Sequence, residues 1–332
     1  MKEQIVLSLF NGMNTLRQAM ENVGIPVKKY YSSEIKPYAI KLTQHHFPDT
    51  IQLGDITKWR EWDIDWSEIT FIGSGSPCQD LSIAGKRAGL SGDKSSLFYT
   101  FIDILEYVKG LNPNVKFLQE NVGSAPKEAI KLMSESLDIL PIRINSNLVT
   151  AQNRDRFYWS NIKVRTDWTG YNWTDIPQPK DRNVYLKNII ESGKVDKEKA
   201  TAILESQSRC VANQKSLKQR ADKDFITVVK EATTKGFVEV KPGDCVDMSF
   251  PTSKTRRGRL MTDKVNCLME AGQEIYYNNG YYLRKLTQIE LERLQGFIDG
   301  YTSILSYNQA SSLLGDGWTL PVIEHILSFY KD

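Results

Sequence analysis

An apolar run breaks into a loop of small residues before a cysteine in the stretch Ile69-Thr70-Phe71-Ile72-Gly73-Ser74-Gly75-Ser76-Pro77-Cys78-Gln79. Short apolar runs bounded by turn residues are typical of buried strands. Loops at the carboxyl ends of strands are where open α/β sheets bind ligands. Cys78 is therefore a candidate nucleophile, and the alternative is a small buried core residue, which most free cysteines are.

The whole chain has the composition of an ordinary soluble globular protein. Its 332 residues are 40% hydrophobic and 25% charged, and its net charge is +3. This length predicts one large domain or two moderate ones. Residues 1–4 lead directly into a strand, and no apolar run approaches a membrane span, so we expect a cytoplasmic protein. Four scattered cysteines without a C-x-x-C pair predict neither a disulfide framework nor a metal site.

The first strand pattern covers residues 5–10 and leads through Asn11-Gly12-Met13-Asn14 into a helical pattern, which Asn14 or Thr15 can cap. Such a loop presents backbone N–H groups beside a helix N-terminus, where a carboxylate or phosphate can bind. Many strand–turn–helix units bind nothing, so a purely structural loop remains the alternative.

Two further strand patterns end at acidic residues. Glu34 follows the strand of residues 29–33, where α/β nucleotide binders hold a ribose. The alternative for Glu34 is an exposed charge at a strand end. Asp55 follows the run of residues 51–53, and it can reach an adenine amino group or cap the turn at Thr57.

Another strand pattern, residues 115–118, leads to Glu120-Asn121-Val122. Strands are also predicted at residues 142–145 and 157–160, with Gln152-Asn153-Arg154-Asp155-Arg156 between them. Side chains along an extended segment alternate in direction, so Arg154 and Arg156 are expected to point the same way. A solvated charged edge is the alternative.

The character of the chain changes between residues 163 and 282, which are polar and lack strand–helix alternation. Basic clusters occur at residues 209–220 and 254–264, and the second holds five basic residues and one acidic residue. Such a patch can contact phosphates, or it can be a lysine-rich soluble surface. Residues 276–282 predict a hairpin with an Asn-Gly turn, and residues 284–294 predict a helix.

Taken together, these motifs resemble the DNA (cytosine-5) methyltransferases and occur in the order found in that family. The motifs are Phe10-Asn11-Gly12, Pro77-Cys78-Gln79, Glu120-Asn121-Val122, Gln152-Asn153-Arg154-Asp155-Arg156 and Leu314-Gly315-Asp316-Gly317-Trp318-Thr319. The chain departs from the family pattern at three places. Asn11 and Asn14 replace an acidic residue and a glycine, Ser74 interrupts a Gly-Gly pair, and residues 316–318 stand where many members have Gly-Asn-Ser-Val.

The resemblance implies an α/β, Rossmann-like methyltransferase fold with a mixed, mostly parallel sheet and a smaller target-recognition domain. Residues 1–160 and 284–332 would form the catalytic domain that binds S-adenosylmethionine, and residues 161–283 the target-recognition domain. The implied partner is double-stranded DNA, and we expect a monomer that requires no metal and no membrane.

The resemblance also implies the site residues. The catalytic set is Cys78, Glu120, Arg154, Arg156, Pro77 and Asn121. The residues that would bind S-adenosylmethionine are Phe10, Asn11, Gly12, Met13, Glu34, Ile35, Asp55, Ile56, Asp316, Trp318 and Thr319. The residues that would bind DNA are Gln79, Ser82, Arg87, Lys254, Arg256, Arg257 and Arg259.

The activity that the resemblance implies is methyl transfer to carbon 5 of cytosine in double-stranded DNA. It would involve base flipping and a covalent bond between Cys78 and carbon 6. Two alternatives remain: a tRNA cytosine-5 methyltransferase, or an inactive methyltransferase-like protein that binds DNA. Inactive relatives typically lose the Pro-Cys or Glu-Asn-Val motif, and this chain has both.

Overall fold

The computed structural model describes residues 2–76, 96–191 and 227–330, the last range with gaps at residues 231, 233, 235–236, 242, 249–252, 254–257, 263, 267–274 and 279–282. Two compact units make up the chain. The first unit comprises Met1–Ser146, Asp155–Lys180 and Gly317–Asp332, and the second comprises Asn147–Arg154 and Asp181–Asp316. These bounds differ from those of the predicted catalytic and target-recognition domains, whose functional division stays a prediction.

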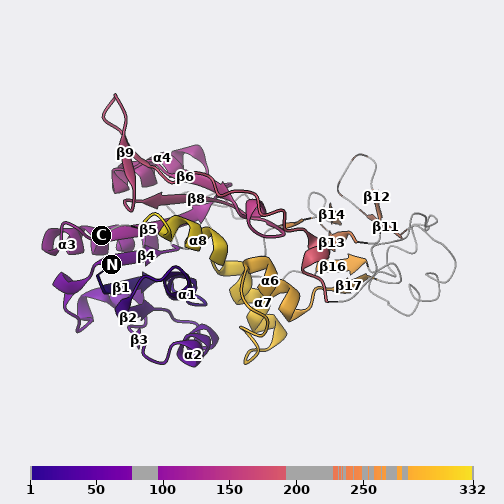
Figure 1. Ribbon diagram of the computed structural model, residues 1–332, viewed down its shortest axis with the longest axis horizontal. Helices are drawn as coiled ribbons and strands as arrows, with labels where there is room; N and C mark the ends of the chain where they lie inside the picture. The colour runs from indigo at the N-terminus through magenta and orange to yellow at the C-terminus, as the bar shows by residue number, and fades with distance from the viewer. Residues whose placement is uncertain are drawn as a thin grey trace. The chain divides into compact units, whose positions relative to one another are not determined.

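The first unit is built on a seven-stranded sheet with the strand order β3-β2-β1-β4-β5-β8-β6 (Figure 1). Strands β1 to β5 are parallel, and β8 lies antiparallel between β5 and β6. The predicted mixed, mostly parallel sheet is confirmed. The strands are β1 (Gln4–Leu9), β2 (Val27–Ser33), β3 (Ile51–Gln52), β4 (Phe71–Ser74), β5 (Lys116–Val122), β6 (Ile142–Asn145) and β8 (Asp155–Ser160).

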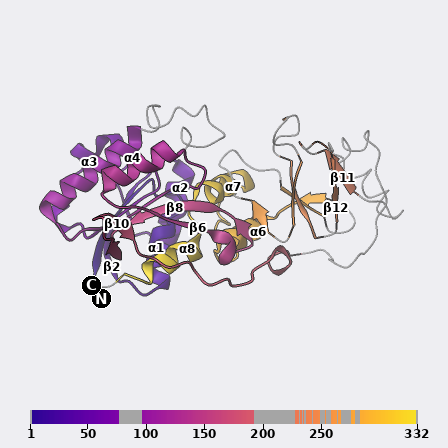
Figure 2. The same cartoon turned by 90° about the horizontal axis from the view of Figure 1, so that it is seen from above.

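Helices cover both faces of this sheet (Figure 2). On one face, α3 (Ser96–Leu111) and α4 (Lys127–Leu137) bury Phe101 and Met133 in a core that includes Leu7 of β1. Burial of one such side chain stabilises the fold by about 1.5–3 kcal/mol. The other helices of the unit are α1 (Thr15–Asn22), α2 (Pro37–His46) and α8 (Leu320–Leu327), and α1 packs against α8.

The second unit contains α6 (Gln288–Gln295) and α7 (Tyr307–Asp316), which contact each other, and a four-stranded antiparallel sheet of order β14-β13-β16-β17. The predicted helix at residues 284–294 is confirmed from Gln288 onward by α6, whereas residues 284 and 285 belong to the strand β17 and not to the helix. The predicted hairpin at residues 276–282 is confirmed in its first strand, because β16 (Ile275–Asn278) pairs antiparallel with β17 (Leu283–Lys285), which begins one residue after the predicted range. Its Asn-Gly turn lies outside the described residues.

The remaining elements are short. In the first unit they are η1 (Ile56–Glu61), η2 (Trp66–Glu68), β9 (Val164–Thr166) and β10 (Asn172–Thr174). Segment η4 (Ser146–Leu148) spans the boundary between the units. The second unit adds β7 (Gln152–Asn153), η5 (Leu186–Asn188), β11 (Thr227–Lys230), β12 (Phe237–Val240), β13 (Cys245–Asp247), β14 (Arg259–Met261) and β15 (Val265–Asn266). Among the helices that the structure describes, none is long and apolar enough to cross a bilayer.

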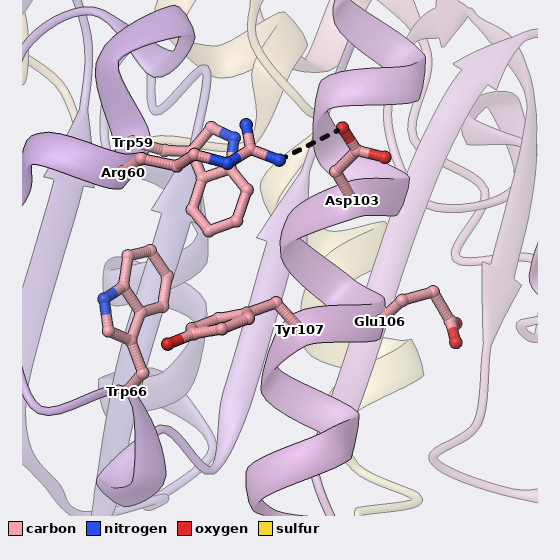
Figure 3. Close-up of a pocket in the computed structure, with 6 residues that line it drawn as sticks. All are labelled: Trp59, Arg60, Trp66, Asp103, Glu106 and Tyr107. Carbon is pink, nitrogen blue, oxygen red and sulfur yellow. Dashed lines mark ion pairs between the residues drawn. The ribbon is translucent and has the colours of Figure 1, made fainter.

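A cavity of about 440 Å³ lies between α3 and the η1–η2 segment of the first unit (Figure 3). Trp59, Trp66 and Tyr107 line it, with ring centroids 5.5 to 5.6 Å apart. The guanidinium carbon of Arg60 lies 4.2 Å from the Trp59 ring centroid. Because η2 leads into the amino end of β4, the cavity lies at the amino-end edge of the sheet. Ligands in such folds bind at the other edge, at the carboxyl ends of the strands.

Candidate active site

The loop after β1 has an unusual backbone. Phe10, Gly12 and Asn14 have φ angles of 57°, 58° and 65°, all in the left-handed region. The N–H of Asn14 donates to the carbonyl of Asn11 at 3.1 Å, which closes the loop into a turn. Asn14 occupies the predicted N-cap position of α1, but its side chain makes no cap hydrogen bond. A capping side chain requires an extended backbone at that position, and Asn14 is left-handed.

Asn11 attaches this loop to its neighbours. Its side-chain amide donates to Oγ1 of Thr43 at 3.2 Å and accepts from the hydroxyl of Tyr30 at 3.1 Å. Burial raises the pKa of Tyr30, so the hydroxyl remains a donor. Two other predicted cofactor residues, Met13 and Ile56, are buried in the first unit. Asn11, Met13 and Ile56 therefore all have a visible structural role beside their predicted one.

Glu34 follows β2 and is held by backbone groups. Its Oε2 accepts from the N–H of Gly12 at 2.8 Å, and its Oε1 accepts from Ile35 and Lys36 at 2.8 and 2.9 Å. Within the part of the chain that the structure describes, Glu34 has no cationic partner. The neighbouring Ile35 is 69% exposed. A fixed carboxylate beside an exposed apolar side chain suits a ligand that has both hydroxyls and a flat ring.

Asp55 follows β3 and caps η1. Its Oδ1 accepts from the N–H and from the hydroxyl of Thr57, both at 2.9 Å. The hydroxyl of Ser33 donates to the carbonyl of Gly54 at 2.7 Å, which ties the loop after β3 to the end of β2. Of the two roles expected for Asp55, the turn cap is observed, and the contact to an adenine amino group stays a prediction.

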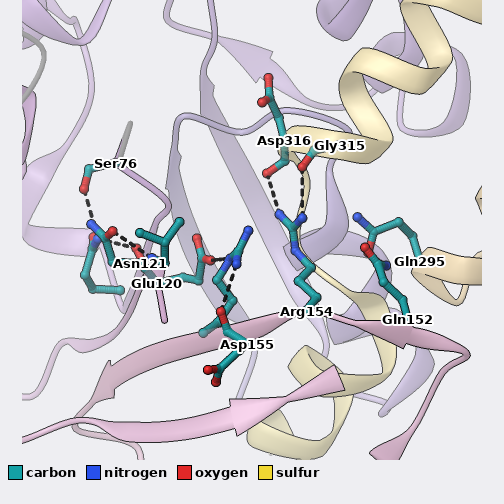
Figure 4. Close-up of polar contacts among 12 residues, drawn as sticks. Ser76, Glu120, Asn121, Gln152, Arg154, Asp155, Gln295, Gly315 and Asp316 are labelled. Atoms are coloured by element: carbon teal, nitrogen blue, oxygen red, sulfur yellow. Dashed lines mark hydrogen bonds and ion pairs between the residues drawn. The ribbon is translucent and has the colours of Figure 1, made fainter. Parts of the chain in front are cut away.

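Glu120, which Figure 4 shows beside Asn121, forms an ion pair with Arg156 across the antiparallel strands β5 and β8. Nε of Arg156 lies 2.7 Å from Oε1 of Glu120, and their side chains are 11% and 10% exposed. Nη1 of Arg156 also donates to the carbonyl of Asp155 at 2.8 Å. In this nearly buried pair, each charge compensates the other.

The strand positions beside Glu120 fix the surroundings of this pair. The side-chain amide of Gln119 donates to the hydroxyl of Ser76 at 3.1 Å and to the carbonyl of Glu120 at 2.7 Å. Asn121 accepts from the N–H of Val122 at 2.7 Å and is 1% exposed. Gln119 therefore connects the chain after β4 to β5, the strand that bears Glu120. The buried side chain of Asn121 adds a hydrogen bond within β5.

Gly123 and Asp155 set the separation of β5 and β8 at the end of the sheet. The N–H of Gly123 donates to the carbonyl of Asp155 at 2.9 Å. A Cβ on Gly123 would lie 2.7 Å from Cγ and 2.8 Å from the carbonyl oxygen of Asp155. Arg143 donates from Nε to both carboxylate oxygens of Asp155, at 3.0 and 2.9 Å. Only glycine allows this close approach beside Arg156.

Arg154 belongs to the second unit and is 3% exposed. Its Nη1 and Nη2 donate to the carbonyls of Gly315 and Asp316 at 3.0 and 3.3 Å (Figure 4). Gln295 donates to the carbonyl of Leu314. The last carbonyls of α7, which have no partner within the helix, are thus satisfied by side chains, and a cation lies at the negative end of the helix dipole.

The residues of the C-terminal motif lie around the junction of α7 and α8. Asp316 is the last residue of α7, and its side chain is exposed. Trp318 is partly buried and lies against Gly73 and Gly75 of the first unit. Thr319 is 1% exposed and occupies the N-cap position of α8.

Several predicted site residues lie outside the described residues, so their roles stay predictions. They are Pro77, Cys78, Gln79, Ser82, Arg87, Lys254, Arg256 and Arg257. Arg259 is described: it is an exposed residue of β14, opposite Asp247 of β13.

Sequence reasoning missed the residues that support the site. Gln119, Ser76, Gly123 and Gln295 make contacts that depend on which strands and helices become neighbours. One signal was available, because Gly123 directly follows Glu120-Asn121-Val122, and a glycine beside a strand often marks a close backbone approach.

Comparison with known proteins identifies the family. A type II methyltransferase of Neisseria lactamica, M.NlaIV, is 31% identical over 209 residues, which cover 56% of this chain and 46% of that protein, so the match spans about half of the relative. The type II methyltransferase M.HpaII of Haemophilus parainfluenzae is 27% identical over 340 residues, covering 96% of this chain and 86% of that protein. The methyltransferase EhMeth of Entamoeba histolytica has the same fold, with a TM-score of 0.60 at 17% identity over 99% of this chain and 98% of that one. The C-5 cytosine-specific DNA methylase family model matches residues 5–331, and the chain therefore belongs to this family.

Proposed function

We propose that the protein transfers a methyl group to carbon 5 of cytosine in double-stranded DNA. The observation that carries this proposal is the buried Glu120–Arg156 pair, next to which the Ser76–Gln119 hydrogen bond holds the chain as it enters Pro77-Cys78. A nucleophile, an acid and a hydrogen-bond donor are the three groups that this reaction needs. In the sequence Cys78 follows β4, while Glu120 belongs to β5 and Arg156 to β8, and these three strands are neighbours in the sheet.

Carbon 5 of cytosine is a poor nucleophile until carbon 6 carries a substituent. The thiolate of Cys78 adds to carbon 6, and the displaced ring electrons move toward N3 and O2. Glu120 gives a proton to N3, and the guanidinium of Arg156 donates a hydrogen bond to O2. Carbon 5 then acts as an enamine carbon and forms the new bond to the methyl group.

The reaction ends by reversing the activation. A base removes the proton from carbon 5, the bond between sulfur and carbon 6 breaks, and its electron pair returns to Cys78. The proton on N3 returns to Glu120, so the enzyme recovers its starting charge. Because the target lies inside a duplex, the base must first be flipped out, at a cost of a few kcal/mol.

The cofactor in this proposal is S-adenosylmethionine, and the loops after β1, β2 and β3 fit it chemically. It supplies an electrophilic methyl group on a sulfonium sulfur, which departs as a neutral thioether. The fixed carboxylate of Glu34 suits the ribose hydroxyls, and the exposed Ile35 suits the adenine face. Both turn hydrogen bonds of Asp55 use Oδ1, so its Oδ2 would accept a hydrogen bond from the adenine amino group. Phe10, Gly12, Trp318 and Thr319 would complete the site.

The substrate separates the proposal from its alternatives. The matching family is that of the C-5 cytosine-specific DNA methylases, which supports DNA as the substrate. The relatives M.NlaIV and M.HpaII come from bacteria, which supports prokaryotic cytoplasm as the place of action. A tRNA methyltransferase and an inactive DNA-binding protein remain the competing hypotheses. Transfer of labelled methyl groups to duplex DNA and to tRNA, measured in parallel, distinguishes all three.

The test of the mechanism uses Cys78→Ser. Wild-type protein is expected to transfer labelled methyl groups to duplex DNA, and this variant is expected to bind the same DNA without turnover. Turnover by the variant would contradict the nucleophile assignment. Bisulfite sequencing of DNA from cells that express the wild-type protein would then give the target site.

A further inference from the structure

Trp318 occupies space that any side chain on Gly75 would need. A Cβ on Gly75 would lie 2.7 Å from Nε1, 3.3 Å from Cε2 and 3.5 Å from Cζ2 of the Trp318 indole. The same indole lies 3.6 Å from the Cβ position of Gly73, through its Cη2 atom. The ring edge therefore covers both glycines at the end of β4.

The contact, and not the backbone, explains why residue 75 is glycine. Gly75 is absent from the glycines with a left-handed φ, so its conformation is open to other residues. The steric conflict involves a large, stiff ring system on one side and a strand end on the other. At Gly73 the closest atom is instead Cδ2 of Leu16, the far end of a flexible side chain.

Both partners of this contact are fixed by the core of the first unit. Gly73 pairs with Ser8 of β1 and Leu118 of β5 inside the sheet. Trp318 directly precedes the N-cap of α8, a helix whose Val322 and Ile323 are fully buried. A residue next to a buried helix thus holds its indole against the end of β4 and against Gly75, the residue that follows the strand.

We infer that Trp318 is a positioning residue for the nucleophile: by its contact with Gly75 it sets the direction in which the chain leaves β4 toward Pro77-Cys78. Gln119 of the neighbouring strand β5 donates a hydrogen bond to the next residue, Ser76. Glycine at position 75 leaves the space that the Trp318 indole fills. The inference rests on the proposed function, because it assumes that Cys78 reacts.

A double-mutant cycle tests the inference. The variants are Gly75→Ala, Trp318→Ala and the two combined. The readout is the rate of covalent adduct formation with duplex DNA containing 5-fluorocytosine, in which fluorine replaces the proton that must leave carbon 5 and so traps the adduct. Saturating S-adenosylmethionine keeps changes in cofactor affinity out of this rate.

We expect the effects of Gly75→Ala and Trp318→Ala on the rate of adduct formation to be strongly coupled. Gly75→Ala should slow the adduct by about 10- to 100-fold beside Trp318, since a misplacement of about 1 Å costs up to that much. In the background of Trp318→Ala, the same change should slow it by less than about threefold, because the clash is gone. Gly110→Ala is the matched control, since a Cβ there meets nothing within 4 Å, and it should leave the rate unchanged.

The outcomes separate the inference from the proposed function. Equal slowing by Gly75→Ala in both backgrounds overturns the positioning role, while the wild-type adduct still supports the mechanism. Absence of any adduct with wild-type protein overturns both. If Gly75→Ala alone does not fold, recovery of soluble, adduct-forming protein on adding Trp318→Ala supports the contact, and failure of that rescue refutes it.

Discussion

Arg154 and Arg156 are two residues apart in one motif, and each binds a different kind of partner. Arg154 donates to the backbone carbonyls at the end of α7 in the second unit. Arg156 contacts the carboxylate of Glu120 in the first unit. Both guanidiniums are nearly buried, and the difference lies in what compensates the charge: helix-end carbonyls for Arg154 and an ionisable side chain for Arg156.

The comparison indicates that the two arginines have separable roles. Carbonyls at a helix end cannot change protonation state, so the Arg154 contact has a structural effect. In the proposed mechanism Glu120 passes a proton to the base and takes it back, so the Arg156 contact is expected to affect activity. Replacement by lysine should therefore mainly reduce activity at position 156 and mainly reduce stability at position 154.

The largest expected effect follows Arg156→Lys. Lysine keeps the charge but lacks the planar fork that can contact Glu120 and a second acceptor together. Methyl transfer to duplex DNA should fall by about 100-fold or more, the usual cost of losing one donor to a developing negative charge. Single-turnover rates measure this loss. Full activity in this variant would remove Arg156 from the proposed mechanism.

Arg154→Lys is the matched variant. Lysine cannot satisfy two carbonyls in the geometry of a guanidinium, and a buried acceptor without a partner costs about 1–3 kcal/mol. The free energy of unfolding, measured with denaturant, should fall by that amount, and activity should fall less than in Arg156→Lys. An equal loss of activity at unchanged stability would contradict the separation of roles.

Gly123→Ala tests the strand spacing behind Arg156. The new Cβ would lie 2.8 Å from the backbone oxygen of Asp155, so β8 must move away from β5. Such overpacking costs about 1–3 kcal/mol, and the displaced Arg156 should lower the rate of methyl transfer by about tenfold. Gly110→Ala, in open space on α3, is the control, and wild-type kinetics in Gly123→Ala would show that the spacing does not matter.

The sequence predicted the strands and the polar strand ends of the first unit because both are local. Local sequence patterns define β2, β3 and β5, and the side chains near the carboxyl ends of parallel strands fall at the same edge of the sheet. This reasoning brought Glu34, Asp55 and Glu120 to the candidate site from the residues alone. The full sets of catalytic and cofactor-binding residues came from the resemblance to a family.

Contacts between distant segments could not be predicted in this way. The alternation rule treated Arg154 and Arg156 as parts of one extended segment, but the chain is not a strand at Arg154, which lies between β7 and β8. The contact between Gly75 and Trp318 joins residues 243 positions apart in the chain, at the end of β4 and just before α8. Local patterns contain no information on such neighbours.

The smallest expected effect concerns a third arginine, Arg143, which pairs with the carboxylate of Asp155 beside Arg156. Its side chain is 57% exposed and that of Asp155 is 32% exposed, and exposed pairs contribute about 0–1 kcal/mol. Arg156 uses the backbone carbonyl of Asp155, which Arg143→Ala leaves in place. Unfolding free energy should therefore fall by less than about 1 kcal/mol, with methyl transfer unchanged at both low and high salt. A loss of activity comparable to that of Gly123→Ala would mean that Arg143 holds Asp155, and through it Arg156, more firmly than a solvated ion pair can.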